Sequence, residues 1–154
     1  MLHLVLHQPQ IAPNTGNLIR LCANTGCQLH LVEPLGFTLD DKRLRRAGLD
    51  YHEWASVQRY RDFDDFLRLC APQRIHAFST RASRCYSEQS YQQEDVLLFG
   101  SETHGLPADL LARLPEENQL RLPMRPGSRS LNLANAAAIA LYEAWRQLGF
   151  VGGR

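Results

Sequence analysis

The sequence predicts an α/β fold built around an open, mostly parallel sheet. Short apolar segments of strand length alternate along the chain with segments of helical periodicity, which is the pattern of a parallel sheet with helical connections. The uninterrupted apolar run at 96–99 is typical of a strand covered on both faces. The clearest helix is the last one, in which one stripe is formed by Leu131, Ala134, Ala138, Leu141, Trp145 and Leu148.

The remaining elements follow from local signals. We expect, in chain order, a strand at 2–6, a helix after the turn-rich segment 9–16 that ends at 24–26, a strand at 28–33, helices at 40–47 and 63–70, strands at 74–80 and 95–100, a short helix at 106–114, a strand at 119–122 and the final helix. Gly48, Pro72 and Gly149 stand where helices are expected to stop. Pro107 suits the start of the short helix.

Composition limits the class of protein. A chain of 154 residues with 44% hydrophobic residues has the usual size of one domain with its own core, so we expect a single domain over residues 1–154. The net charge of +1 means that any RNA binding has to use a local basic surface. No segment has the pattern of a signal peptide or a membrane span, so we expect a cytoplasmic protein with no membrane partner.

Cysteine and histidine usage does not indicate a metal site. The four cysteines form no Cys-x-x-Cys pair and have no histidines at zinc-finger spacing, which favours reduced thiols and no bound metal. The six histidines occur singly, and a lone histidine is more often a packed or surface residue than a catalytic one. We therefore assign no histidine to catalysis.

Ligands of open parallel sheets bind in loops beyond the carboxyl ends of strands, and the first such loop precedes the first helix. There Asn17 and Arg20 lie about one turn apart on a shared helix face, near a helix N-terminus that suits an anion. For these residues alone, the simpler interpretation is that Asn14 caps the helix and Arg20 is a solvated charge.

A second candidate loop, at 99–107, follows the most apolar strand. Gly100 lets a ligand approach the backbone closely, and Glu102 is placed to meet a cation or to accept hydrogen bonds from loop amides. A tight turn with a capping acid explains the same residues about equally well.

The third candidate loop, at 122–132, brings Ser130 and Asn132 into the first turn of the last helix. Ser130 has a simple alternative role as N-cap. Asn132 is harder to explain in this way, because asparagine is a poor helix former without a partner.

The sequence also contains a basic cluster and lacks two common nucleotide-binding motifs. The segment 40–46 places Lys42 and Arg46 on one helix face, which suits a phosphate backbone, although a solvated helix is the simpler interpretation. Neither G-x-G-x-x-G after a strand nor G-x-x-x-x-G-K-[ST] occurs, which argues against a dinucleotide oxidoreductase and a P-loop NTPase.

The sequence motifs of these loops are more specific as evidence when they are taken together and in order. The motifs at 13–26, 41–52, 99–102 with 105–107, 128–133 and 142–146 cover essentially the whole chain. With these motifs the chain resembles the SPOUT methyltransferases, and within them the small subfamily that 2'-O-methylates the wobble nucleotide of bacterial leucine tRNAs.

The resemblance implies a fold, a cofactor and an assembly. The C-terminal segment would thread through a loop to form a deep trefoil knot, which general topology rules disfavour. S-adenosylmethionine would bind in the knot against Phe78, Gly100, Leu122, Ser130 and Leu131. Members of the family are homodimers with the first and last helices at the interface, and the partner subunit completes each active site.

The implied reaction transfers a methyl group to the ribose 2'-hydroxyl of cytidine or modified uridine at the wobble position of tRNA, and it needs no metal. Because a sulfonium donor is already activated, the enzyme has to align the hydroxyl and help remove its proton. Arg20 corresponds to the family's catalytic arginine. A guanidinium is a poor base, so we assign Arg20 to a tRNA phosphate beside the hydroxyl.

Supporting roles are implied for other residues. Ser130 and Asn132 would orient Arg20 and the cofactor, and Glu102 would support the loop of the site. The anticodon stem-loop would be gripped by Lys42, Arg43, Arg46 and Arg129.

The chain departs from the subfamily pattern at His104, where arginine is common, and at Phe78, where leucine is common. Neither departure removes a reacting group. Two alternatives remain: an enzyme of the same class that acts on another tRNA position or on ribosomal RNA, and a noncatalytic RNA-binding module. The joint presence of Arg20, Glu102 and the pair Ser130 and Asn132 argues against the module.

Overall fold

The computed structural model describes residues 1–154 and is organised around one parallel sheet. Its strands are β1 (His3–His7), β2 (Gln28–Val32), β3 (Gln58–Tyr60), β4 (Ile75–Phe78), β5 (Arg84–Cys85), β6 (Val96–Phe99) and β7 (Gln119–Arg121). The strand order is β3-β2-β1-β6-β4-β7-β5, and every pairing is parallel. The predicted α/β fold with a parallel sheet is therefore confirmed.

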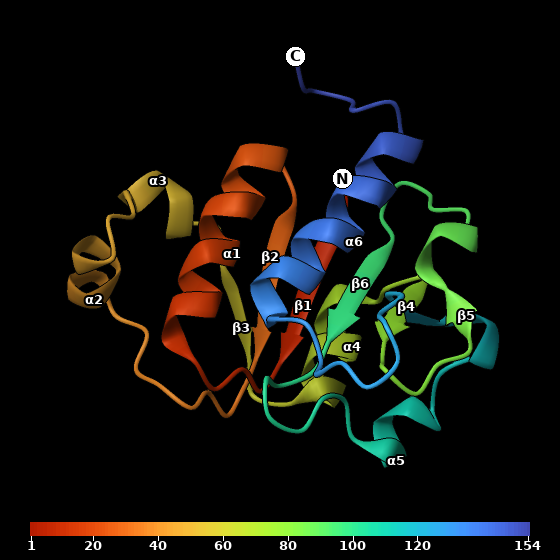
Figure 1. Cartoon of the computed structure of the whole chain (residues 1–154). Helices are drawn as coiled ribbons and strands as arrows, with labels where there is room; N and C mark the ends of the chain where they lie inside the picture. Colours follow the sequence, from red (N-terminus) through yellow and green to blue (C-terminus); the bar gives the residue numbers. More distant parts are fainter.

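Helices lie on both faces of this sheet. They are α1 (Ala12–Thr25), α2 (Asp41–Arg46), α3 (Tyr51–Trp54), α4 (Phe63–Cys70), α5 (Ala108–Leu111) and α6 (Leu133–Gln147), with short 3-10 turns at Tyr86–Glu88 and Glu116–Asn118. Figure 1 shows α1 and α6 side by side in front of the sheet and α4 behind it. No helix is both long enough and apolar enough to cross a membrane.

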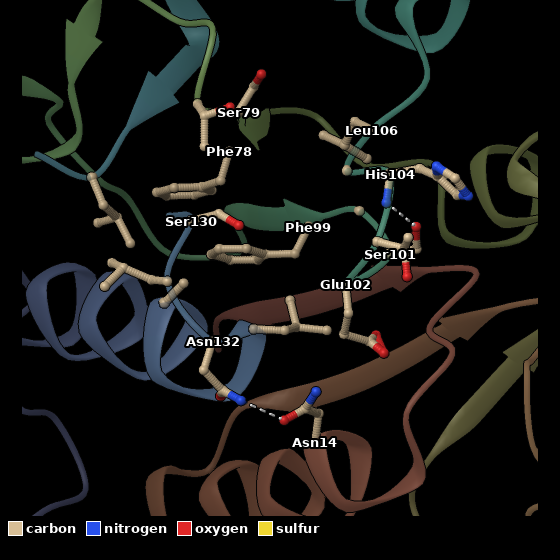
Figure 2. Close-up of a pocket in the computed structure, with 18 of the residues that line it drawn as sticks. Asn14, Phe78, Ser79, Phe99, Ser101, Glu102, His104, Leu106, Ser130 and Asn132 are labelled. Carbon is tan, nitrogen blue, oxygen red and sulfur yellow. Dashed lines mark hydrogen bonds between the residues drawn. The ribbon is translucent and has the colours of Figure 1, made fainter. Parts of the chain in front are cut away.

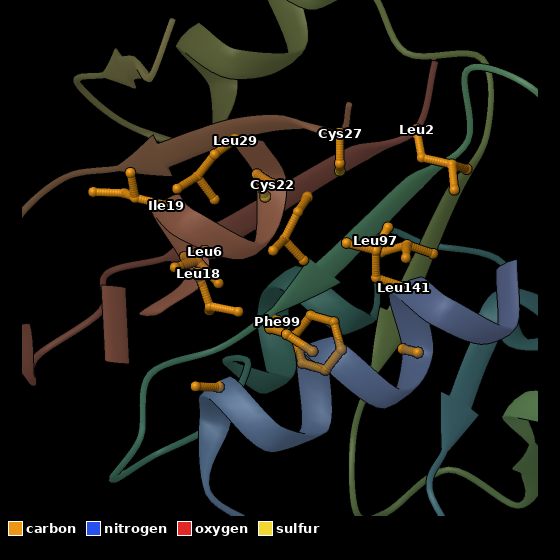
Figure 3. Close-up of a cluster of buried hydrophobic side chains, with 14 of the residues drawn as sticks. Leu2, Leu6, Leu18, Ile19, Cys22, Cys27, Leu29, Leu97, Phe99 and Leu141 are labelled. Carbon is orange, nitrogen blue, oxygen red and sulfur yellow. The ribbon is translucent and has the colours of Figure 1, made fainter. Parts of the chain in front are cut away.

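The alternation of side chains along the strands divides the core into two layers. In β1, Leu4 and Leu6 belong to the cluster under α1 and α6, whereas Val5 belongs to the cluster under α4 and α5. In β6, Leu97 and Leu98 divide in the same way. Figure 3 shows the first cluster, where side chains of α1 and α6 meet the sheet. This two-sided burial explains why the run at 96–99 is continuously apolar.

The buried face of α6 differs from the predicted stripe. The side chains that it buries are Leu133, Ala134, Ala137, Ala140, Leu141 and Ala144. Of the predicted stripe only Ala134 and Leu141 are buried, and Leu131 precedes the helix and is exposed. Alanines let the helix pack closely against the sheet and α1. The buried face is therefore rotated about the helix axis relative to the predicted stripe, and Ile139 and Tyr142 lie in solvent.

Helix starts also differ from the prediction. Helix α1 begins at Ala12, inside the turn-rich segment, because Pro13 is compatible with a first helical turn. Asn14 therefore does not cap it and lies in that first turn instead. Helix α6 begins at Leu133 with Asn132 as its N-cap, so Ser130 and Asn132 precede the helix and Ser130 is not the cap.

The expectations omitted α3, β3 and β5. Helix α3 has a readable signal, because Asp50 and Glu53 form a capping box at its start. Strands β3 and β5 are only 3 and 2 residues long, and sequences of that length show no periodicity.

A chain of hydrogen bonds crosses the sheet near its amino edge. His3 contacts Glu94 through Nε2 (2.9 Å) and His30 through Nδ1 (3.0 Å). His30 Nδ1 in turn lies 2.8 Å from the Tyr60 hydroxyl, which lies 2.9 Å from Cys70 Sγ. A carboxylate only accepts, so with neutral rings each donor points toward Glu94, from the Cys70 thiol through Tyr60, His30 and His3.

This network makes stability depend on pH. Burial, and then the proximity of His3, lowers the pKa of His30 from 6.5 to about 4. The unfolded chain takes up this proton near 6.5 and the folded chain only near 4, so stability present at neutral pH is lost as pH falls. We expect the free energy of unfolding to drop by about 2 kcal/mol between about pH 7.5 and pH 5 from His30 alone.

Urea unfolding at several pH values tests this. His30→Gln removes the titrating group and should flatten the slope, whereas His52→Gln, at an exposed position of α3, should preserve it. An unchanged slope in His30→Gln would contradict the assignment.

Candidate functional site

A hollow lies at the carboxyl ends of β4, β6 and β7. It has a volume of about 450 Å³ and is lined by residues 78–81, 99–106, 122, 124, 130–133 and 136, with Ile11 and Asn14 from the start of α1. These segments are far apart in sequence and meet because parallel strands end at the same edge. We call this hollow the knot-loop pocket, after the knot that the family resemblance implies at this place. Figure 2 shows its side chains.

One wall of the knot-loop pocket is apolar and rigid. Phe78 and Phe99 stack with ring centroids 4.5 Å apart and planes 8° apart, as Figure 2 shows. Leu122 and Leu131 extend this lining. A side chain at Gly100 would overlap backbone atoms of Gly105 and Leu106, so only glycine lets the 100–106 loop fold back on itself here.

Glu102 fastens this loop to the start of α1. Its carboxylate accepts hydrogen bonds from the backbone N–H groups of Gln10 (3.1 and 3.0 Å) and Ile11 (2.5 Å). These amides belong to a helix start, where N–H groups lack helical partners and negative charge is favoured. Glu102 therefore has the loop-supporting contact that the sequence indicated.

Asn132 has two partners, which explains an asparagine at this position. Its Oδ1 accepts from the N–H of Asn135 (3.2 Å), and its Nδ2 donates to Asn14 Oδ1 (3.0 Å). The second bond links the starts of α6 and α1 (Figure 2). Ser130 is exposed and lines the knot-loop pocket two residues earlier.

Arg20 lies outside the knot-loop pocket of its own chain. Its Nε donates to Glu53 Oε1 (3.0 Å), and Nη2 donates to Glu53 Oε2 (3.4 Å) and to the carbonyl of Gly48. The bonded Glu53 raises the pKa of Arg20, and Arg20 with the Asp50 amide lowers the pKa of Glu53. Asn132 bonds Asn14 instead. The side chain of Arg20 is nevertheless 49% exposed.

The four predicted RNA-contacting residues are all exposed. Lys42, Arg43 and Arg46 lie on α2, and Arg129 lies in the loop before α6. Arg43 has a carboxylate nearby, that of Asp40 at 3.6 Å. The cationic groups of Lys42, Arg46 and Arg129 make no ion pair within the chain, which leaves them available to an anionic partner.

The structure thus brings Phe78, Gly100, Glu102, Leu122 and the segment 130–132 together in the knot-loop pocket, and it places Arg20 and the basic residues elsewhere. Sequence reasoning missed Asn14 as the partner of Asn132 and Glu53 as the partner of Arg20. The capping-box spacing of Asp50 and Glu53 was a signal for α3, but nothing in it pointed to Arg20.

The lining of the knot-loop pocket fits S-adenosylmethionine. The apolar wall suits the face of a nucleoside base, and the hydroxyls and backbone groups of 79–81, 101 and 130–132 suit a ribose and an amino-acid end. No group of three potential metal ligands occurs in the chain.

Gly100→Ala is expected to damage this pocket. The new methyl group meets backbone rather than a flexible side chain, so we expect a loss of about 2 kcal/mol in unfolding free energy and a loss of S-adenosylmethionine affinity. Gly16→Ala is the matched control, because its nearest neighbour is Leu49 at 3.9 Å and alanine is favourable within a helix. Denaturation and calorimetric titration measure both; equal behaviour of the two variants would refute the assigned role of Gly100.

Comparison with known proteins agrees with this geometry. The family described as the SpoU rRNA Methylase family matches residues 1–142. A relative from Escherichia coli strain K12, the tRNA (cytidine(34)-2'-O)-methyltransferase, is 57% identical over 152 residues, covering 99% of this chain and 97% of the relative.

Solved structures resemble the whole fold. One, described as giving structural insights into the 2-OH methylation of C/U34 on tRNA, has a TM-score of 0.87 and 46% identity and covers 97% of each chain. An AdoMet-bound rRNA methyltransferase from Sinorhizobium meliloti has a TM-score of 0.82 and 27% identity over 96% of this chain and 56% of that one. The family resemblance inferred from the motifs is confirmed, and the chain belongs to the SpoU methylase family.

Proposed function

We propose that the chain transfers the methyl group of S-adenosylmethionine to the ribose 2'-hydroxyl of the wobble nucleotide of tRNA, position 34, with leucine isoacceptors as substrates. The observation that carries the proposal is the convergence of Phe78, Gly100, Glu102, Leu122 and the segment 130–132 on one pocket. It is supported by 57% identity to a tRNA (cytidine(34)-2'-O)-methyltransferase over nearly the whole chain. Because tRNA is the substrate, the protein acts in the cytoplasm.

When bound, the sulfonium cofactor supplies an already activated methyl group, so the residues of the chain align the acceptor rather than activate the donor. Phe78, Leu122 and Leu131 exclude water from one side of the knot-loop pocket. The Glu102 and Asn132 contacts hold the starts of α1 and α6 in place. Ser130 presents its hydroxyl at the mouth.

Arg20 holds a phosphate of the tRNA beside the reacting hydroxyl, and a phosphate oxygen or a relay accepts the proton. The supporting observation is that Arg20 is half exposed and bound to a carboxylate, Glu53. A phosphate, like a carboxylate, offers a pair of acceptor oxygens that a guanidinium binds bidentately, so it can take the place of Glu53.

The site is completed by a second copy of the chain. Exposed apolar side chains gather on α6 and next to it: Leu131 is 41%, Ile139 42% and Tyr142 46% exposed, and Ile11 at the start of α1 is 47% exposed. Such an apolar surface is typical of an interface. A homodimer through α1 and α6 gives Arg20 of one protomer a route to the pocket of the partner.

The C-terminal segment forms a trefoil knot around the cofactor site. The support is topological. Strand β7 lies beyond β4 in the sheet, whereas α6 packs against α1 and β6. The connection 122–132 therefore returns across the carboxyl edge, past the loops at 79–81 and 100–106 with which it shares the pocket.

The exposed cations of α2 and Arg129 grip the phosphates of the anticodon stem-loop. A related enzyme that methylates another tRNA position or ribosomal RNA is the second candidate, favoured by the likeness to the Sinorhizobium meliloti rRNA methyltransferase. Mapping the methylated nucleotide in total tRNA and in ribosomal RNA separates these two. A noncatalytic module would bind RNA without transferring label from S-adenosylmethionine.

Arg20→Ala is expected to lower kcat/KM for methyl transfer into tRNA by roughly 100-fold or more, because it removes a preorganised charge at the reacting centre. Arg20→Lys should recover little, since an ammonium does not bind bidentately. Affinity for S-adenosylmethionine should not change, because Arg20 does not line the knot-loop pocket.

Arg68→Ala is the matched control for Arg20. Arg68 is an exposed arginine of α4 that also pairs with a carboxylate, Asp65 at 2.6 Å, on the opposite face of the sheet. Transfer of labelled methyl with mapping of the labelled nucleotide is the measurement. If Arg20→Ala retained full activity, or lost cofactor binding as well, the assigned role would be wrong.

Charge placed on the apolar face of α6 is expected to separate the dimer. Ile139→Glu combined with Tyr142→Glu buries two carboxylates at the proposed interface. We therefore expect the dissociation constant of the dimer to rise by roughly 100-fold or more. Leu69→Glu, at another exposed apolar position on α4, should have no such effect. Sedimentation velocity gives the oligomeric state; a wild-type monomer would defeat the proposal outright.

A further inference from the structure

A second pocket adjoins the knot-loop pocket and is not used by the proposed reaction. It has a volume of about 340 Å³, and one of its ten lining residues is hydrophobic. It shares Ser101, His104 and Gly105 with the knot-loop pocket. In Figure 2 the His104 ring points away from the Phe78 and Phe99 pair. The loop at 100–107 is therefore a wall common to two pockets.

The walls of this second pocket are fixed before any ligand binds. Gln8 N–H donates to the carbonyl of Val32 (2.9 Å), and Gly36 N–H donates to that of Pro9 (2.9 Å). A side chain at Gly36 would meet Gln10 Cα at 2.7 Å. Glu102 ties the same segment to the 100–107 loop through the amide of Gln10. A pocket with preset walls is suited to selective binding.

His7 has an unused binding capacity in this pocket. Its side chain is 7% exposed and lines the pocket, and its ring nitrogens have no hydrogen-bond partner in the chain. The ring is held edge-on against Phe63, with centroids 6.2 Å apart. Burial lowers its pKa, against the opposing effect of Asp109, so at neutral pH the ring offers one donor and one acceptor. Neither ring nitrogen is sealed from solvent, so a ligand in the pocket can hydrogen-bond with them.

The backbone of Gln8 has a conformation that residues other than glycine rarely adopt. Its φ is 54°, in the left-handed region, and such strain at a non-glycine residue is concentrated at binding sites. Gln8 and Gln10 line the same pocket as His7. The amides that matter here are those of their side chains, since their backbone N–H groups already have partners. Each amide adds a donor and an acceptor.

We propose that this second pocket binds a nucleobase of the substrate RNA, next to the ribose that enters the knot-loop pocket, with His7 and Gln8 reading its edge. The inference rests on the proposed RNA methyl transfer and adds a specificity site to it. His104 closes the side that faces the shared loop.

The chemistry of the lining selects this class of ligand. No lysine, arginine, aspartate or glutamate lines the pocket, so a phosphate or a cation has no counter-charge there. Most of the lining surface is carbon, to which Pro34, Leu35 and Pro107 contribute, and this suits the flat face of a ring. Imidazole and amide groups match a base edge, where donors and acceptors alternate. A glutamine amide can turn over to match either cytosine or uracil, so we expect the base of the methylated nucleotide itself to bind here.

The test combines protein variants with single base deletions in RNA. Anticodon stem-loops carry an abasic ribose at the methylated nucleotide or at either neighbour, and kcat/KM is measured for the wild type, His7→Phe and Gln8→Ala. Phenylalanine keeps the packing of His7 on Phe63 without its nitrogens. The matched control is Gln92→Ala, which changes an exposed glutamine in the segment that precedes β6. Calorimetry and thermal melting check cofactor affinity and folding.

On intact RNA we expect each variant to lose roughly three- to tenfold in kcat/KM, with unchanged cofactor affinity and melting temperature. Deleting the base that binds should lower wild-type kcat/KM by about tenfold. The same deletion should hardly change kcat/KM of the variants, since they have already lost the contact with this base. The abasic position at which this occurs identifies the base.

Two results would overturn the inference, and they are distinguishable. If the effects of the variants and of the base deletions on kcat/KM multiply at every abasic position, the pocket does not bind a base, although the proposed methyl transfer stands. If the wild type binds S-adenosylmethionine but methylates no RNA, the proposed function fails and the inference falls with it.

Discussion

The geometry of the site depends on one carboxylate, that of Glu102. It accepts hydrogen bonds from the Gln10 and Ile11 amides, which stand at a helix start and have no helical partner. This joins the loop after the central strand β6 to the connection between β1 and α1. Because that loop is a wall of both pockets, a single charge-assisted contact positions the knot-loop pocket and the adjoining second pocket together.

Much of the fold was predictable because its signals are local. The run at 96–99 is apolar at each position since β6 lies in the middle of a sheet with helices on both faces. Two of the three candidate loops, at 99–107 and 122–132, converge on the knot-loop pocket as expected, because the carboxyl ends of parallel strands share an edge. The segment 78–81, which was not among the candidate loops, joins them there. Of the segment before the first helix only Ile11 and Asn14 line the pocket, and Arg20 lies outside it.

The contacts between loops were not predictable, because they depend on three-dimensional placement. Asn132 looked out of place in a helix, and its partner Asn14 lies 118 residues away in sequence. Arg20 looked like a free charge, and its partner Glu53 belongs to a helix of 4 residues that periodicity cannot detect. The buried face of α6 was misjudged because alanine is apolar on any face, and only the close packing of Ala137, Ala140 and Ala144 selects one.

The position of Arg20 connects chemistry to assembly. A ribose hydroxyl has to meet the methyl donor in line, and a charge that assists proton removal must lie within hydrogen-bond reach of the same centre. In one chain Arg20 lies outside the knot-loop pocket and bonds Glu53. Its helix α1 packs beside α6, whose outer face leaves Ile139 and Tyr142 exposed. Under the proposed function, the surface that joins two protomers also brings Arg20 to the pocket of the partner, so activity would require the dimer even though each chain forms the whole knot-loop pocket by itself.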